Sequence, residues 1–462
     1  MLRRLLLVAA FLLLGSAPMA HGQTSDTPKK VILLIPDGFG PASHTMGRDM
    51  LRALRGQEMT VLDSLQTGSV HTYSTSQRIT DSAAGATAYA TGVKTYNGAI
   101  AVNPKKQPLG TILEAAEARG MATGLVATSR ITHATPAAFA AHVPDRDQEN
   151  EIAAQMLKHN IEVVLGGGRR HFLPTSDDGR RADGRNLIEA ATADGYRYAA
   201  TAKELAAIEQ PPVLGLFAAS HMAYEIDRET TQQPSLAEMA RTAIDLVKDD
   251  PEGYFLMIEG SRIDHAGHAN DAAAHAGDIL AFYDAVQVAL DAARAQGNTL
   301  VVVVSDHATG GLSLAREVDG ESEYHWYPKK LAQVQASHGA MYAAAKEARE
   351  PAKVVQKMLG FSNLTDEERK HIAEAATIGD VYTFGGVITD IVGRRVRTGW
   401  TTHGHTARDV NLYAFGPGRA HFIGHHDNTY VGDTLARLMG VNLDAQTAQL
   451  RKDMASKAAA GK

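Results

Sequence analysis

The chain has 462 residues, of which 44% are hydrophobic and 42 are glycine, and its formal net charge is −6. This length suits two or three average domains or one large α/β domain with insertions, and the acidic balance argues against a nucleic-acid-binding surface. The lack of cysteine excludes disulfides and thiolate zinc ligands. Any bound metal must therefore be held by histidine nitrogen and by oxygen ligands.

The first residues have the pattern of a secretory signal peptide. Arg3 and Arg4 precede an apolar run at residues 5–14, which is too short to span a bilayer. We expect cleavage near Ala20 or Gly22 and a periplasmic or secreted protein; losing two arginines would change the formal charge from −6 to −8. No second apolar run suits a membrane helix and the C-terminus has no lipid-anchor signal, so we expect no membrane anchor.

After this segment, apolar strand candidates alternate with helix candidates along the chain. A short helix is expected from Ser82 to a stop at Gly92, and a later helix starts at the capping box formed by Ser235 and Glu238. The expected strands are residues 31–36, 122–127, 161–165, 213–217, 254–258, 300–304 and 411–415, and further helices are expected at 111–119 and 271–295. This alternation predicts an α/β fold, a three-layer α/β/α sandwich with a largely parallel central sheet.

One polar and charged segment, residues 316–397, interrupts this alternation. Thr365 and Glu368 form another capping box, so part of the segment is expected to be helical. We interpret it as an inserted surface subdomain. The predicted organisation is a signal peptide (1–22), a catalytic domain (23–315 and 398–445), the inserted subdomain (316–397) and a polar C-terminal tail (446–462).

The stretch from Thr80 to Thr87 places a serine where a phosphate could bind. Asp81 and Ser82 open the expected short helix, and the unpaired N–H groups at a helix N-terminus favour an anion. A serine at that position could attack phosphorus and hold the phosphoryl group. An isolated Asp-Ser-Ala is more often only a helix cap, so this hypothesis depends on the rest of the chain.

Acidic and imidazole residues recur where the expected strands end. Parallel strands end at one edge of a sheet, which is where open α/β folds bind ligands, and such side chains are costly to bury unless they bind something. The stretches are Asp37-Gly38, Glu259 to His268, Ser305-Asp306-His307 and Thr401 to Thr406. Together with the serine they form the pattern that a two-metal site requires.

These stretches resemble the alkaline phosphatase family from about Val31 to about Met439, most weakly across residues 316–397. The similar segments are Pro36-Asp37-Gly38, DSAAGATAYATG (81–92), HATPAAFAAHV (133–143), IEGSRIDHAGH (258–268), SDHATGG (305–311) and TTHGHTARDV (401–410). The resemblance implies a phosphate-monoester hydrolase of broad specificity with an alkaline pH optimum. Members of this family are often homodimers, so a homodimer is one expected state.

The resemblance also implies a set of metal ligands. One Zn²⁺ would be held by Asp264, His268 and His405. A second Zn²⁺ would be held by Asp37, Asp306 and His307, with the oxygen of Ser82. Asp37 would bridge towards a third metal, normally Mg²⁺, held by Thr135 and Glu259. Imidazole-rich sites suit zinc, whereas carboxylate and hydroxyl oxygens suit magnesium.

Further roles follow from the same resemblance. Ser82 would be the nucleophile that forms a phosphoserine intermediate, and Arg146 would bind two phosphate oxygens through its planar guanidinium. This sequence has His133 and His265 where some relatives carry aspartate and lysine. We expect His133 to be a softer ligand near the third site, which could then accept zinc, and His265 to contact bound phosphate.

Two other functions remain open from the sequence. A phosphodiesterase or sulfatase of the same superfamily could share the metal ligands, although those relatives use threonine or a modified cysteine where Ser82 stands. An exported metal- or phosphate-binding protein would have no need of an activated nucleophile. Hydrolysis of a monoester, compared with a diester, separates these alternatives. The expected substrates are small-molecule phosphate monoesters, with no specific binding of nucleic acid.

Overall fold

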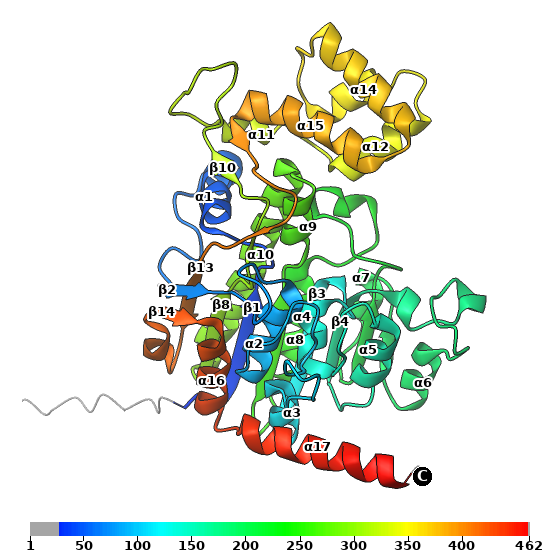
Figure 1. Ribbon diagram of the computed structural model, residues 1–462, viewed down its shortest axis with the longest axis vertical. Coiled ribbons are helices and arrows are strands. Elements are labelled where there is room, and N and C mark those ends of the chain that lie inside the picture. Colours follow the sequence, from blue (N-terminus) through cyan, green and yellow to red (C-terminus); the bar gives the residue numbers. More distant parts are fainter. Residues whose placement is uncertain (1–26, 461–462) are drawn as a thin grey trace, which may run out of the picture.

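The computed structural model describes residues 27–460 (Figure 1). The expected signal peptide lies outside the described residues. The strands are β1 (Lys30–Ile35), β2 (Gln66–His71), β3 (Ala122–Arg130), β4 (Val163–Gly167), β5 (Arg197–Ala199), β6 (Val213–Leu216), β7 (Tyr254–Glu259), β8 (Thr299–Val304), β9 (Ala308–Thr309), β10 (Ser313–Leu314), β11 (Thr398–Gly399), β12 (His405–Thr406), β13 (Val410–Phe415) and β14 (Gly424–Asp427).

Helices fill most of the chain between these strands. They are α1 (Pro41–Arg55), α2 (Ser82–Thr91), α3 (Ile112–Glu117), α4 (Ala134–Ala140), α5 (Glu149–Met156), α6 (Leu187–Ala193), α7 (Ala202–Ala206), α8 (Leu236–Val247), α9 (Arg262–His268), α10 (Ala272–Gln296), α11 (Pro328–Leu331), α12 (His338–Glu347), α13 (Pro351–Leu359), α14 (Asp366–Ile378), α15 (Val381–Val396), α16 (Asn428–Met439) and α17 (Leu443–Ala460). Short 3₁₀-helices are η1 (Arg169–His171), η2 (Thr175–Asp177), η3 (Glu225–Thr230) and η4 (Arg419–Phe422).

A ten-stranded sheet forms the middle layer, in the order β14-β2-β13-β8-β1-β7-β3-β4-β6-β5. Neighbouring strands are parallel except around β13, which runs antiparallel to both β2 and β8. In β1, Ile35 is in register with Glu259 of β7, and Leu34 with Val303 of β8. The carboxyl ends of these three central strands therefore meet at one edge of the sheet.

Helices cover both faces of the sheet, as the alternation of side chains along β1 shows. Ile32 and Leu34 belong to one buried cluster with apolar residues of α1, α8 and α10. Val31, Leu33 and Ile35 belong to a second cluster with residues of α2, α3, α4 and α16. Because successive strand residues point to opposite faces, the two clusters are the two sides of a three-layer sandwich. The predicted fold class is confirmed.

The strands and helices expected in the catalytic part are present, with ends that differ by a few residues. The capping boxes at Ser235 and Thr365 both form, each side chain accepting a hydrogen bond from the backbone N–H three residues later. The sequence analysis missed β2, β5 and β14, which lie at the two sides of the sheet. All three are only partly buried, and β5 and β14 are also short, so they lack the apolar run that identified the central strands.

Residues 316–397 form the helices α11 to α15, which gather at one end of the molecule, coloured yellow to orange (Figure 1). Their buried residues, including Met341 and Phe384, join the same apolar cluster as α1 and α10. The segment expected as a polar tail is helical, because α17 extends to Ala460. This helix lies against the loop before α3, where Arg451 Nε donates to the Pro108 carbonyl at 2.9 Å.

Across residues 27–460, the structure contains no helix that combines the length and the apolar character needed to span a membrane.

Candidate metal centre and nucleophile

Three carboxylates lie at the carboxyl edge of the central strands. Asp37 follows β1, Glu259 ends β7 and Asp306 follows β8. All three are buried, with at most 1% of each residue exposed. Strands far apart in the sequence thus bring together the acidic residues that the sequence analysis singled out.

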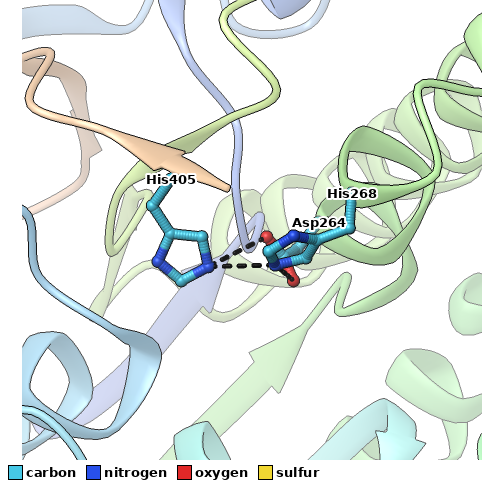
Figure 2. A group of neighbouring side chains, drawn as sticks. All are labelled: Asp264, His268 and His405. Carbon is cyan, nitrogen blue, oxygen red and sulfur yellow. Dashed lines mark hydrogen bonds and ion pairs between the residues drawn. The ribbon is translucent and has the colours of Figure 1, made fainter. Parts of the chain in front are cut away.

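The first group of potential ligands consists of Asp264, His268 and His405 (Figure 2). Asp264 and His268 are four residues apart on α9, so they share one helix face, and His405 reaches them from β12. The Nε2 atoms of the two histidines are 3.1 Å apart. Asp264 oxygens lie 3.4 Å from His268 Nε2 and 3.6 Å from His405 Nε2.

The backbone orients both histidines of this group. Nδ1 of His268 donates to the His403 carbonyl, and Nδ1 of His405 donates to the Thr80 carbonyl at 2.9 Å. A neutral imidazole that gives its Nδ1 hydrogen to a carbonyl has a lone pair at Nε2. Both lone pairs are therefore aimed at the carboxylate of Asp264, the arrangement that a metal ion needs.

The second group consists of Asp37, Asp306 and His307, which are all buried. His307 Nε2 lies 3.2 Å from Asp306 Oδ2 and 3.6 Å from Asp37 Oδ1. Burial, followed by the nearby His405, holds the pKa of His307 well below its usual value. The ring is therefore neutral and can act as a metal ligand.

Ser82 lies directly beside the second group. Its Oγ is 3.1 Å from His307 Nε2 and 3.5 Å from Asp37 Oδ2. Ser82 is the first residue of α2, whose N-cap Asp81 accepts a hydrogen bond from Ala84 N at 3.0 Å. As expected, the helix ends at Gly92, which has a left-handed backbone. The serine is thus held at a helix N-terminus against the proposed ligands.

The buried carboxylates fit metal ions because one oxygen of each lacks a hydrogen bond from the described residues. Asp37 Oδ1, Glu259 Oε1 and Asp306 Oδ2 accept no hydrogen bond from residues 27–460. Burial raises the pKa of Glu259 and of Asp306 to about 7, and raises that of Asp37 well above its usual value, with repulsion from Asp306 adding to the shift. Divalent cations at these oxygens would offset both the missing hydrogen bonds and the cost of burying charged carboxylates.

The residues expected at a third metal gather around Glu259. Both Thr135, in α4, and Glu259 are fully buried, and Thr135 Oγ1 has no hydrogen-bond partner among the described residues. His133 is the N-cap residue of α4, and its Nε2 accepts a hydrogen bond from Arg146 Nη2 at 3.1 Å. The lone pair of this ring is therefore engaged, and metal ligation by His133 requires Arg146 to move or the ring to turn.

Arg146 joins the nucleophile helix to the third site. Its Nη1 is 3.0 Å from Asp81 Oδ2, and its backbone N–H donates to the Gly98 carbonyl at 2.8 Å. Asp81 Oδ2 also accepts from Gly98 N at 2.9 Å. The N-cap of α2 thereby fixes the position of the guanidinium that we expect to bind phosphate.

The sequence analysis missed a group of histidines and arginines beside His133 and His265. The His221 ring lies 4.3 Å from the His265 ring and 5.3 Å from the His133 ring, centroid to centroid. Arg262 Nη1 lies 2.9 Å from His265 Nδ1, and Arg130 pairs with both His221 and Glu149. His221 lies just after β6, so the rule that ligands gather at strand ends could have found it.

A parallel sheet covered by helices, with two carboxylate–imidazole groups beside a buried serine, is typical of an α/β hydrolytic enzyme whose site could hold metal ions. Comparisons with known proteins agree. The alkaline phosphatase family profile matches residues 28–441. The repressible alkaline phosphatase of Saccharomyces cerevisiae is 38% identical, over 97% of this chain and 87% of the yeast protein.

Solved structures lead to the same family. A cold-active alkaline phosphatase from Shewanella sp. superimposes with a TM-score of 0.81 at 37% identity, covering 89% of this chain and 99% of that one. A histidine-to-aspartate variant of the alkaline phosphatase from the Antarctic bacterium TAB5, with magnesium in its M3 site, gives a TM-score of 0.66 at 28% identity, with coverages of 90% and 99%. This chain belongs to the alkaline phosphatase family and is a phosphoric monoester hydrolase.

Proposed function

We propose that the enzyme hydrolyses a broad range of phosphate monoesters at alkaline pH through a phosphoserine intermediate on Ser82. The observation that carries this proposal is the position of the Ser82 hydroxyl. It lies at a helix N-terminus within 3.5 Å of both His307 and Asp37, which belong to the second group of potential ligands. A serine that only capped α2 would not need this position, and Asp81 already supplies the cap.

The proposed ions are two Zn²⁺ and one Mg²⁺. Asp264, His268 and His405 would hold the first zinc, and Asp37, Asp306 and His307 the second, with Ser82 Oγ beside it. Magnesium would lie between Asp37, Thr135 and Glu259, whose oxygens include unpartnered atoms. When bound, these ions would lower the pKa of the serine hydroxyl and of water and would neutralise charge on the phosphoryl group.

The protein residues then perform two displacements at phosphorus. The Ser82 hydroxyl gives its proton to solvent as Oγ attacks the phosphoryl group. An Oγ–P bond forms, the bond from phosphorus to the leaving oxygen breaks, and that oxygen takes a proton from water to leave as the alcohol. Water next attacks the phosphoserine, which releases inorganic phosphate and restores the serine hydroxyl. Arg146 would hold two phosphate oxygens in both steps, and the N–H groups of α2 favour the anion.

The test of this proposal is chemical trapping on the metal-loaded enzyme. Quenching in acid during turnover of a labelled monoester should place label on Ser82, and Ser82→Ala should lose several powers of ten in kcat with its metal content unchanged. Ser76→Ala, in the preceding loop, is the matched control and should keep full activity. Label that never appears on Ser82 would favour direct attack by water. Chelation should abolish activity, and zinc with magnesium should restore it.

Export and assembly form a separate part of this proposal. We infer that residues 1–22 direct the protein to the periplasm or to the medium, because Arg3 and Arg4 precede a short apolar run. Division of the chain into a catalytic domain and an inserted subdomain at 316–397, and assembly as a homodimer, also remain predictions. N-terminal sequencing of the purified protein and its mass in solution would test the cleavage and the dimer.

A further inference from the structure

A hollow of about 480 Å³ lies between α15 and the chain that leads from α15 to β12. We call it the α15 hollow and define it by Trp400, Thr401, His403, Asn270, Arg316 and Asp390. Figure 1 shows the orange segment after α15 passing α9 on its way to β13.

The α15 hollow adjoins the first group of potential ligands. His403 Nδ1 donates to the His268 carbonyl at 2.8 Å, and the His403 carbonyl accepts from His268 Nδ1. Asn270 Nδ2 donates to the Thr402 carbonyl at 3.0 Å. One wall of the hollow is therefore fixed by hydrogen bonds to His268.

The place of the α15 hollow relative to Ser82 bears on the proposed reaction. Ser82 lies beside the second group of ligands, at 3.1 Å from His307. In an in-line displacement the leaving oxygen departs on the side opposite the nucleophile. The His307 and His405 rings stack with their centroids 3.5 Å apart, so the first group lies next to the second. We infer that the leaving group departs on the side of the first group, where the α15 hollow lies.

The lining is polar around a single aromatic side chain. Arg316 Nη2 and Asp390 Oδ1 form an ion pair at 2.7 Å, and Thr401 adds an exposed hydroxyl. Trp400 is the aromatic group. Its position is fixed by an edge contact with the His275 ring at 5.5 Å and by Gly310, where a Cβ atom would lie 2.4 Å from the indole. The hollow thus combines one rigid apolar face with several hydrogen-bonding groups.

Asn270 is a second indication that the α15 hollow is a binding site. It is 3% exposed, and its backbone is left-handed with φ of 52°, which asparagine tolerates better than most residues. Its side-chain Oδ1 accepts no hydrogen bond from the residues the structure describes. Thr389 of α15 donates to the Asn270 carbonyl at 3.1 Å, so the inserted segment is bonded to this wall.

We propose that the α15 hollow is a leaving-group subsite for a polyhydroxylated ring, such as the sugar of a sugar phosphate. The ring would place its apolar C–H face on Trp400 and its hydroxyls against Arg316 and Asp390. A purely aromatic leaving group would occupy the same space but form no hydrogen bonds with the Arg316–Asp390 pair, which lowers its binding relative to the polyhydroxylated ring. The inference rests on the proposed phosphomonoesterase site.

The kinetic test compares two substrates of the metal-loaded enzyme. Glucose 6-phosphate carries a polyhydroxylated ring, and methyl phosphate cannot reach the hollow. Arg316→Met and Trp400→Leu should each lower kcat/KM for glucose 6-phosphate about 5- to 20-fold, the size expected for one lost hydrogen bond or stacking contact, and change methyl phosphate less than about twofold. Trp326→Phe is the matched control, because Trp326 donates a hydrogen bond to Asp49 on α1 and lies outside the hollow.

A binding measurement supplies a readout that does not need turnover. The chain has two tryptophans, so Trp326→Phe leaves Trp400 as the single fluorescent indole. Glucose should change its emission in a saturable way, and adding Arg316→Met should weaken that response about 5-fold or more. Equal losses of kcat/KM for both substrates, or no change in Trp400 emission on adding glucose, would contradict the proposed subsite. Failure to hydrolyse methyl phosphate would instead contradict the proposed function.

Discussion

Asp278 links the stability of this fold to pH. The residue lies in the second turn of α10, and its Oδ2 accepts a hydrogen bond from Glu225 N at 3.2 Å. Burial raises the pKa of Asp278 from 3.8 to about 8, although the charge of Arg262 opposes the shift. The folded protein therefore holds a proton on this carboxyl at pH 7, whereas the unfolded chain does not.

The sign and size of the effect follow from proton linkage. A carboxyl whose folded-state pKa is raised contributes its full stability below pH 4 and loses it as the pH rises towards 8. Each pH unit in that window corresponds to about 1.4 kcal/mol, so the loss between pH 6 and pH 9 is about 3 kcal/mol. Asp278→Asn cannot ionise and keeps an oxygen for Glu225 N, so the variant should lack this loss.

Urea unfolding with saturating zinc and magnesium, at pH 6 and at pH 9, measures the difference. Wild type should lose about 3 kcal/mol relative to Asp278→Asn between the two pH values, with unchanged m-values. Asp245→Asn is the matched control, because the Asp245 side chain is 58% exposed. Parallel behaviour of wild type and Asp278→Asn would refute the reasoning, since it would mean that Asp278 is already ionised in the folded protein.

Three further substitutions address the phosphate and third-metal positions. Arg146→Ala should lower kcat/KM for a monoester by one to two powers of ten, because the guanidinium fixed by Asp81 is removed. His133→Asp should retain more magnesium after dialysis, measured by elemental analysis, since it adds a hard oxygen near Thr135. His265→Lys should lower the inhibition constant of phosphate and slow turnover at high pH; an unchanged constant would mean that His265 does not contact phosphate.

The central strands could be predicted because each is an apolar run that is stable only when it is buried in the middle of the sheet. Residues 300–304 are an unbroken apolar run, and β8 is buried along its whole length. By contrast, β14 reads Gly-His-His-Asp, and it is a strand only because β2 lies beside it. Pairing with a distant neighbour decides such segments, and local sequence does not contain that information.

The candidate site likewise has a part that the sequence predicts and a part that it does not. Acidic and imidazole residues at strand ends could be predicted to converge, and the structure brings Asp264, His268 and His405 together. The pairing of Arg146 with His133, and the arginine–histidine group around His221, could not be predicted, because both depend on loop paths that no periodicity describes. Long-range contacts therefore determine what surrounds the ligands, while the strand pattern determines which edge they occupy.

The spread of the potential ligands along the chain has a consequence for how the protein is made. The first group draws on α9 and β12, and the second on the ends of β1 and β8, so neither group is complete within one local segment. During synthesis, His405 is added after nearly nine-tenths of the 462 residues. The second group is complete once His307 has been added, whereas the first group needs His405 and is complete only when the chain is almost finished.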